Sequence, residues 1–238
     1  FSRIPIVSNR KYWGEREMGI IALDKENQAR EGSWVEINLN TLATNTRMLI
    51  GSLSTSTEII FVVKADAYGH GIVSVANRAA QEGVRCFAVA TMEEAATLRN
   101  TLPEAKILML GVAFPNDIEE LVNRKIIPVI VSEEHGLELA SAVRAMGCVL
   151  DIHLKFDTGM GRLGIDWNTG VDVMSRLLKK PELSISGLCS HFASVEPNLS
   201  STGDVQYSRF RKILQRAPKK MFIHLANSRA FQSSLKWD

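Results

Sequence analysis

The sequence predicts an α/β fold, a (β/α)8 barrel of the TIM type that is incomplete in this chain. Seven short apolar segments recur at intervals of roughly 20 to 36 residues, which leaves room for a helix and two loops between parallel strands. The glycine-rich phosphate loop that opens a doubly wound sheet is absent from the first strand–helix turn. We therefore expect seven βα units, without the eighth strand that closes a barrel.

The expected strands are nearly continuous apolar runs, which favours a sheet covered on both faces. They are Ile59–Val63, Cys86–Ala90, Ile107–Leu110, Ile127–Val131, Val149–Leu154, Ile185–Cys189 and Met221–Leu225. Helix start and stop signals lie between them. These signals are the capping boxes Thr91/Glu94 and Asn116/Glu119, the N-cap Ser132 with the terminator Gly147, and the terminators Pro181 and Pro218.

Length and composition allow one sizeable core, since the chain has 238 residues of which 45% are hydrophobic. We expect a barrel domain over residues 34–238, preceded by an extension, residues 1–33, whose role the sequence leaves open. A seven-stranded parallel barrel leaves two unpaired edges, which natural proteins close or cover. We therefore expect the polypeptide to continue after Asp238, or a partner to complete it.

The charges nearly cancel, with 28 Lys plus Arg against 26 Asp plus Glu, so a nucleic acid or anionic membrane is not expected as partner. The basic stretch over residues 209–220 fits the solvated face of an outer helix. The longest apolar run, Ile107 to Phe114, is far shorter than the ~20 residues of a membrane-spanning helix. A small-molecule partner is expected instead.

The cysteines and histidines show no metal-ligand spacing, so no metal is expected. Cys86, Cys148 and Cys189 lie in apolar contexts without a CxxC pair, which indicates reduced thiols. A cytoplasmic location follows as the expectation.

Lys64 is the most informative residue. It follows the first apolar strand and opens the run Lys64–Gly71, KADAYGHG. A lysine that leaves a buried strand at a barrel mouth is placed to form a Schiff base with an aldehyde cofactor, because desolvation favours the free amine. A solvated surface lysine is the alternative reading.

This run, with Val63 before it, resembles the cofactor-lysine signature of the bacterial alanine racemase family. The resemblance implies that Lys64 holds pyridoxal 5'-phosphate and serves as one of two proton-transfer bases. It also implies that Tyr68 hydrogen-bonds the cofactor phosphate.

A second motif, Lys155–Gly164, is expected to begin where the fifth strand ends, and it resembles the family's second signature. The resemblance implies that Arg162 approaches the cofactor's phenolic oxygen and the substrate carboxylate, with Met160 also at the substrate. A planar guanidinium suits a carboxylate. Lys155 corresponds to a lysine that is carbamylated in many relatives, where it orients the arginine. A solvated Asp-Thr-Gly turn is the alternative.

The sixth strand leads into Leu188–Ser194, which is similar to the family's Ser-His-Phe segment. That similarity places His191 near the cofactor ring. The chain then departs from the family pattern, since Val195-Glu196 stands where alanine-aspartate is common. A histidine with a purely structural role remains the alternative.

The seventh strand leads into Phe222–Ser228. By resemblance Ser228 binds the cofactor phosphate, while His224 and Asn227 support the site from the barrel wall. An Asn-Ser step also serves as an ordinary helix N-cap that needs no ligand.

All four motifs fall at the carboxyl ends of expected strands, where barrel enzymes build their active sites. The resemblance implies an isomerase that interconverts L- and D-alanine for bacterial cell-wall peptidoglycan and that is a homodimer when complete. In that family a strand-eight arginine and a β-rich domain with an opposite-face tyrosine complete the site, and neither is in this chain. Two alternatives stay open: a non-catalytic or weakly active barrel that binds pyridoxal phosphate, and a pyridoxal-phosphate barrel decarboxylase.

Overall fold

A computed structural model describes residues 35–195 and 200–232, and the expected extension 1–33 lies outside them. Within the described residues, those from Asn38 onward form one compact unit. Seven strands of this unit form a single parallel sheet in sequence order, and a two-residue strand pairs with the fifth of them. The seven strands are β1 (Ile60–Val62), β2 (Cys86–Val89), β3 (Lys106–Met109), β4 (Ile126–Ile130), β5 (Leu150–Asp157), β7 (Leu183–Cys189) and β8 (Phe222–His224), and the short one is β6 (Ile165–Asp166).

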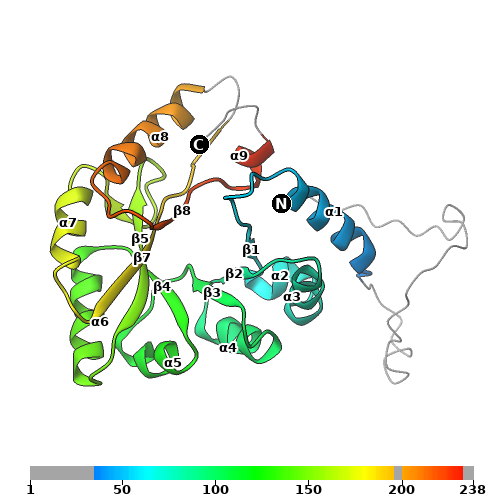
Figure 1. Cartoon of the computed structure of the whole chain (residues 1–238), viewed down its shortest axis with the longest axis horizontal. Helices are drawn as coiled ribbons and strands as arrows, with labels where there is room; N and C mark the ends of the chain where they lie inside the picture. Colours follow the sequence, from blue (N-terminus) through cyan, green and yellow to red (C-terminus); the bar gives the residue numbers. More distant parts are fainter. Residues whose placement is uncertain (1–34, 196–199, 233–238) are drawn as a thin grey trace, which may run out of the picture. The chain divides into compact units, whose positions relative to one another are not determined.

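The helices surround the curled sheet on its outer side (Figure 1). In chain order they are α1 (Leu39–Gly51), α2 (Lys64–Gly69), α3 (Ile72–Gln81), α4 (Met92–Thr101), the 3₁₀ turn η2 (Pro115–Asp117), α5 (Ile118–Asn123), α6 (Glu133–Ala145), α7 (Gly170–Leu177), α8 (Ser200–Leu214) and α9 (Ser228–Gln232). The alternation of strand and helix confirms the predicted βα repeat.

The two faces of the sheet bury different residue sets. On β2, Phe87 and Val89 belong to the large core that includes helix side chains. Cys86 and Ala88 point the other way and pack with Leu108 of β3 inside the curl. All four β2 residues are buried, as the continuous apolar pattern predicts.

The sheet does not close on itself. β1 pairs only with β2, and β8 pairs only with β7, so the described part of the chain has two open edges. Figure 1 shows β1 and β8 at the two ends of the curled sheet. The prediction of an incomplete barrel with seven main strands is confirmed.

Five helix signals behave as predicted. Thr91 caps α4 and forms a capping box with Glu94. Ser132 caps α6 by accepting a hydrogen bond from the His135 N–H at 3.1 Å, and Gly147 follows the end of that helix with φ of 65°. Pro181 and Pro218 come shortly after the ends of α7 and α8.

Two boundaries were predicted wrongly. β5 continues to Asp157, whereas the continuous apolar pattern ended at Leu154, because pairing with β7 and β6 extends the strand through the polar residues on either side of Phe156. Lys155 therefore lies within the strand, not after it. The expected Asn116/Glu119 capping box does not form; instead the Asp117 carboxylate accepts the Phe114 N–H at 2.7 Å, ahead of a 3₁₀ turn.

Candidate active site

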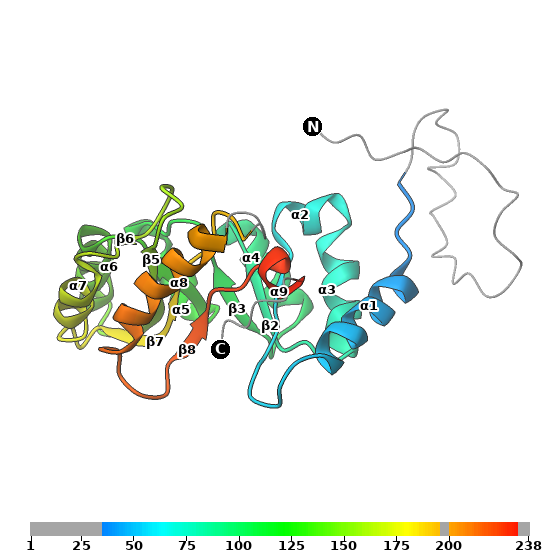
Figure 2. The ribbon, with the colours of Figure 1, turned by 90° about the horizontal axis from the view of Figure 1, so that it is seen from above.

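The loops that carry the four motifs lie on one side of the sheet. α2 follows β1, the β6 segment follows β5, and α9 follows β8. Figure 2 shows these three segments on the same side of the strands. This is the side of the carboxyl ends, where barrel proteins build their reactive sites.

Lys64 opens a turn of unusual handedness. The next four residues, Ala65 to Tyr68, have φ between 51° and 55° and ψ between 39° and 52°, so α2 is left-handed there. Each L-residue in this conformation costs roughly 1–2 kcal/mol. None of the four is glycine, so contacts around the turn must hold it in place.

Hydrogen bonds at both ends fix the turn. The Ala67 N–H donates to the Val63 carbonyl oxygen at 2.9 Å. At the other end, the Asp66 carboxylate accepts the N–H of Ile72, the first residue of α3, at 2.7 Å. Val63 is fully buried. Lys64 is thereby held between a buried strand and a helix start, with its side chain half-buried.

The loop after β5 is organised by one carboxylate. Asp157 accepts the backbone N–H groups of Gly159 and Met160 at 2.8 Å and that of Arg162 at 3.0 Å. Burial alone would raise the pKa of Asp157, but these backbone donors, with Gly161, outweigh it and hold the pKa below its usual value. The ionised carboxylate therefore fixes the backbone from which the Arg162 side chain leaves.

Helix α8 supports the same loop. The Arg209 guanidinium donates to the Thr158 carbonyl oxygen at 2.9 Å and lies over the Trp167 ring, 4.9 Å from its centroid. The buried Thr158 hydroxyl lies 2.8 Å from the Ser190 hydroxyl, which joins the β5 and β7 ends. The prediction that the whole basic stretch is a solvated face is therefore wrong for Arg209.

His191 marks the place where three cations converge. Burial lowers the pKa of its imidazole, and the positive charges of Lys155, Arg162 and Lys64, in that order, lower it further. Lys64 is the first residue of α2, Lys155 lies in β5 and Arg162 lies in the loop after β5. Within residues 35–195 and 200–232 none of the three has an ion-pair partner. The site therefore carries excess positive charge, which an anionic ligand would neutralise.

Below this cluster two histidines share a hydrogen bond across the sheet. His153 Nδ1 lies 2.9 Å from His224 Nε2. Desolvation lowers the pKa of His153 to about 4, helped by the charge of Lys106. Desolvation also lowers the pKa of His224 to about 3, helped by His153 and then Lys155. The pair is therefore neutral at pH 7, and Nε2 of His224 is engaged in the bond with His153.

The segment after β8 holds the predicted phosphate-binding serine. Asn227 caps α9, because its side-chain oxygen accepts the Ala230 N–H at 2.9 Å. Ser228 is the first residue of that helix and is exposed. Tyr68, the other predicted phosphate contact, is 58% exposed. The side chains of Tyr68 and Ser228 are thus accessible, whereas the side-chain oxygen of Asn227 already accepts a hydrogen bond within α9. Glu196 lies outside the described residues.

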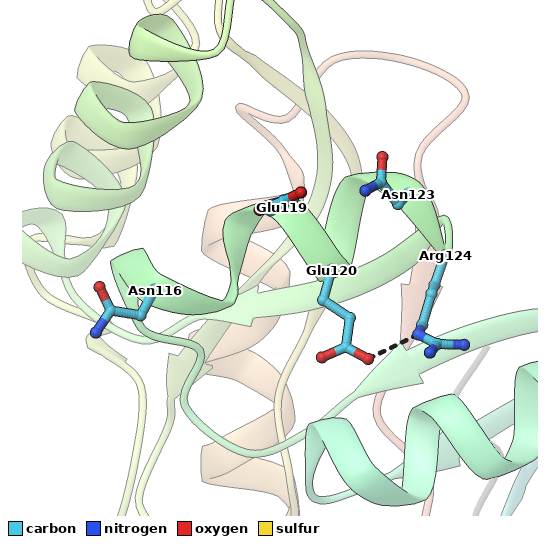
Figure 3. Close-up of a pocket in the computed structure, with 5 residues that line it drawn as sticks. All are labelled: Asn116, Glu119, Glu120, Asn123 and Arg124. Atoms are coloured by element: carbon cyan, nitrogen blue, oxygen red, sulfur yellow. Dashed lines mark hydrogen bonds and ion pairs between the residues drawn. The ribbon is translucent and has the colours of Figure 1, made fainter.

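Other features of the surface and core are poorer candidates. A hollow of about 580 Å³ lies along the outer helix α5, where Glu120 and Arg124 form an ion pair (Figure 3). It contains none of the strand-end residues. Cys86 and Cys189 are free thiols whose pKa burial raises to about 12, so they are poor nucleophiles. No helix in the described part of the chain is long and apolar enough to cross a bilayer.

Fold and site together define a parallel βα-barrel protein with a lysine at the first strand end and a cationic cluster on the carboxyl face. Comparison with known proteins identifies the family. The family described as "Alanine racemase, N-terminal domain" matches residues 37–236, and the chain belongs to it.

Individual relatives agree with this assignment. The alanine racemase of Synechocystis sp. is 35% identical over 213 residues, which cover 87% of this chain and 57% of that protein. A crystal structure of alanine racemase from Bacillus anthracis with bound L-Ala-P aligns with a TM-score of 0.76 and 30% identity, over 82% of this chain and 52% of that one. The Bartonella henselae alanine racemase with covalently bound pyridoxal phosphate aligns with a TM-score of 0.74 and 27% identity, over 82% and 56%.

The match covers only part of those proteins. The chain spans about half the length of the curated relatives it matches, between 53% and 57% for the first three.

Proposed function

We propose that the protein containing this chain is a pyridoxal 5'-phosphate-dependent racemase that interconverts L- and D-alanine. The observation that carries the proposal is the position of Lys64 directly after the buried Val63 at the end of β1, in a left-handed turn held by hydrogen bonds at both ends. The family membership adds the reaction class.

The residues present fit this cofactor. An anionic aldehyde requires one amine at a fixed position and positive charge around it. Lys64 fits as the amine, because hydrogen bonds hold the turn that it opens. Tyr68 in α2 and Ser228 in α9 are exposed, the two helices lie on the same side of the sheet (Figure 2), and both hydroxyls are proposed to bind the phosphate. When bound, pyridoxal phosphate withdraws electrons from the substrate's α-carbon and makes its proton removable.

The chain's own residues supply positioning and proton transfer. Lys64 Nζ is proposed to accept and return the α-proton on one face of the substrate. Arg162, fixed through its backbone by Asp157, is proposed to bind the substrate carboxylate. Met160 is proposed to contact the same substrate.

The remaining residues support the cofactor. His191 is proposed to stand beside the cofactor ring and Asn227 to support the phosphate segment, while the neutral His153–His224 pair backs the barrel wall. Lys155 is proposed to be carbamylated, since a negative charge there would orient Arg162 and relieve the repulsion between two neighbouring cations.

Racemisation also requires a proton donor on the opposite face. By family resemblance a tyrosine in a β-rich domain of the partner subunit supplies it, so the active form is proposed to be a cytoplasmic homodimer. Its D-alanine would serve cell-wall synthesis.

The test is the appearance of D-alanine from L-alanine, followed by chiral chromatography of the full-length protein supplied with pyridoxal phosphate. Lys64→Ala is expected to lower the rate by roughly 10²- to 10⁴-fold, the range for a positioned acid or base. Lys179→Ala, which removes an exposed lysine at the end of α7, is the matched control and should leave the rate unchanged. Wild-type protein that releases carbon dioxide from basic amino acids, without forming D-alanine, would instead support a decarboxylase.

A further inference from the structure

Glu94 joins two strand ends through one carboxylate. Its Oε1 accepts the Ala65 N–H at 2.6 Å. Its Oε2 accepts the N–H groups of Ala90 at 2.7 Å and Thr91 at 3.3 Å. One oxygen therefore serves the turn after β1, and the other serves the start of α4 after β2.

The Ala65 N–H belongs to the peptide that follows Lys64. On the other side of Lys64, the Val63 N–H donates to the Ala88 carbonyl oxygen of β2 at 2.8 Å. Lys64 thus lies between two anchored peptides, one held by the sheet and one held by Glu94. Because Ala65 begins the left-handed stretch, Glu94 binds the chain where the strained conformation starts.

At two comparable helix starts on this side of the barrel, the capping side chain itself bonds only within its own segment, although His135 in the first turn of α6 also contacts the Ala113 carbonyl oxygen at 2.8 Å. The Ser132 hydroxyl accepts the N–H of His135 in its own helix at 3.1 Å. The Asp117 carboxylate accepts the N–H of Phe114, three residues earlier, at 2.7 Å. Capping α4 requires only Oε2 of Glu94, so the bond from Oε1 to the lysine turn is an addition to the cap.

We infer that Glu94 is a positioning residue for Lys64: its carboxylate holds the left-handed turn so that Nζ meets the cofactor aldehyde and the substrate α-carbon in a fixed orientation. This inference rests on the proposed function. The step it serves is condensation of the Lys64 amine with the aldehyde, which forms a carbon–nitrogen double bond and releases one water. Glu94 itself touches neither reactant.

Glu94→Asp separates the two tasks of the side chain. Aspartate keeps a carboxylate in the first turn of α4, but it is one methylene shorter and cannot serve both strand ends at once. Ser132→Ala is the matched control, because it removes a helix cap on the same side of the barrel without touching the lysine turn.

Two measurements are made on each protein. The first is hydrogen exchange of the Ala65 amide without cofactor, which is expected to quicken about tenfold or more in Glu94→Asp and to stay at the wild-type rate in Ser132→Ala. The second is the rate at which pyridoxal 5'-phosphate and cyanoborohydride convert Lys64 to its pyridoxyl derivative, followed by mass spectrometry. We expect this rate to fall roughly tenfold in Glu94→Asp only, with kcat for alanine falling similarly at unchanged KM.

The outcomes separate the two claims. Wild-type protein that never gains a pyridoxyl group on Lys64 would overturn the proposed function. If the wild type is modified, and Glu94→Asp is modified as fast as the wild type or slowed no more than Ser132→Ala, then Glu94 only caps α4 and the positioning inference is wrong.

Discussion

The histidine pair inside the barrel makes the fold acid-sensitive in a specific pH window. His153 is 1% exposed and shares a hydrogen bond with His224, and the pKa values of the two are about 4 and about 3 in the fold. In the unfolded chain both titrate at about 6.5. Between about pH 6.5 and 4 the unfolded chain therefore binds protons that the folded protein does not.

The sign and the size follow from proton linkage. Because the unfolded state binds more protons, the free energy of unfolding falls as pH falls through this window, and the stabilisation is complete above about pH 6.5. Each histidine contributes a slope of about 1.4 kcal/mol per pH unit, so the pair contributes about 2.8 kcal/mol per pH unit. Removing the titration of His224 should remove at least half of that slope.

The perturbation is His224→Gln, which keeps a hydrogen-bonding side chain that does not titrate. Urea unfolding, followed by tryptophan fluorescence from pH 4.5 to 7.5, gives the free energy of unfolding at each pH. Ser175→Ala, which removes an exposed hydroxyl of α7, is the control and should leave the slope as in the wild type. A His224→Gln slope equal to that of the wild type would refute the reasoning.

Three further predictions concern the site and its support. Gly187→Ala should destabilise the fold by roughly 1–3 kcal/mol in urea unfolding, because the new Cβ would lie 2.5 Å from the His153 ring; an unchanged midpoint would contradict the packing. Asp157→Asn removes one of the two carboxylate oxygens that accept backbone N–H groups of the Arg162 loop, and it should lower the free energy of unfolding by about 1–3 kcal/mol at pH 7. Since the folded pKa of Asp157 is depressed, its contribution exists above about pH 3.9 and is lost as pH falls through the folded pKa, so the wild-type advantage should vanish in acid. Lys155→Met should raise the pKa of the His191 imidazole, measured by NMR titration, because a nearby positive charge is removed. If Lys155 is carbamylated in the wild type, the substitution removes a negative charge and the pKa should fall instead. An unchanged pKa would contradict the proximity of Lys155 and His191.

The strands were predictable because each is an apolar run separated from the next by a helix-length interval. The end of β5 was not, because the polar residues Lys155 and Asp157 interrupt the apolar run around Phe156, and pairing with β6 and β7 extends the strand through them. Local hydrophobicity contains no information about such pairing. The seven-strand order followed correctly from the repeat alone.

The site residues follow from the family resemblance and stay predictions, whereas the contacts that support them could not be predicted. Lys64 and Arg162 stood out through family resemblance, and physical position at strand ends agreed with it. The left-handed turn was not predictable, because alanine and tyrosine rarely adopt positive φ and the single aspartate among the four residues is too weak a signal. Glu94 was read as part of a capping box, which is correct, but its bond to Ala65 joins residues 29 positions apart and depends on the strand order.

The central claim is that Lys64 holds pyridoxal phosphate at the carboxyl end of β1. The most direct test is borohydride reduction of the protein with bound cofactor, followed by peptide mass spectrometry. We predict a pyridoxyl group on Lys64 in near-stoichiometric amount. Finding the group spread over exposed lysines, or finding Lys64 unmodified, would contradict the claim.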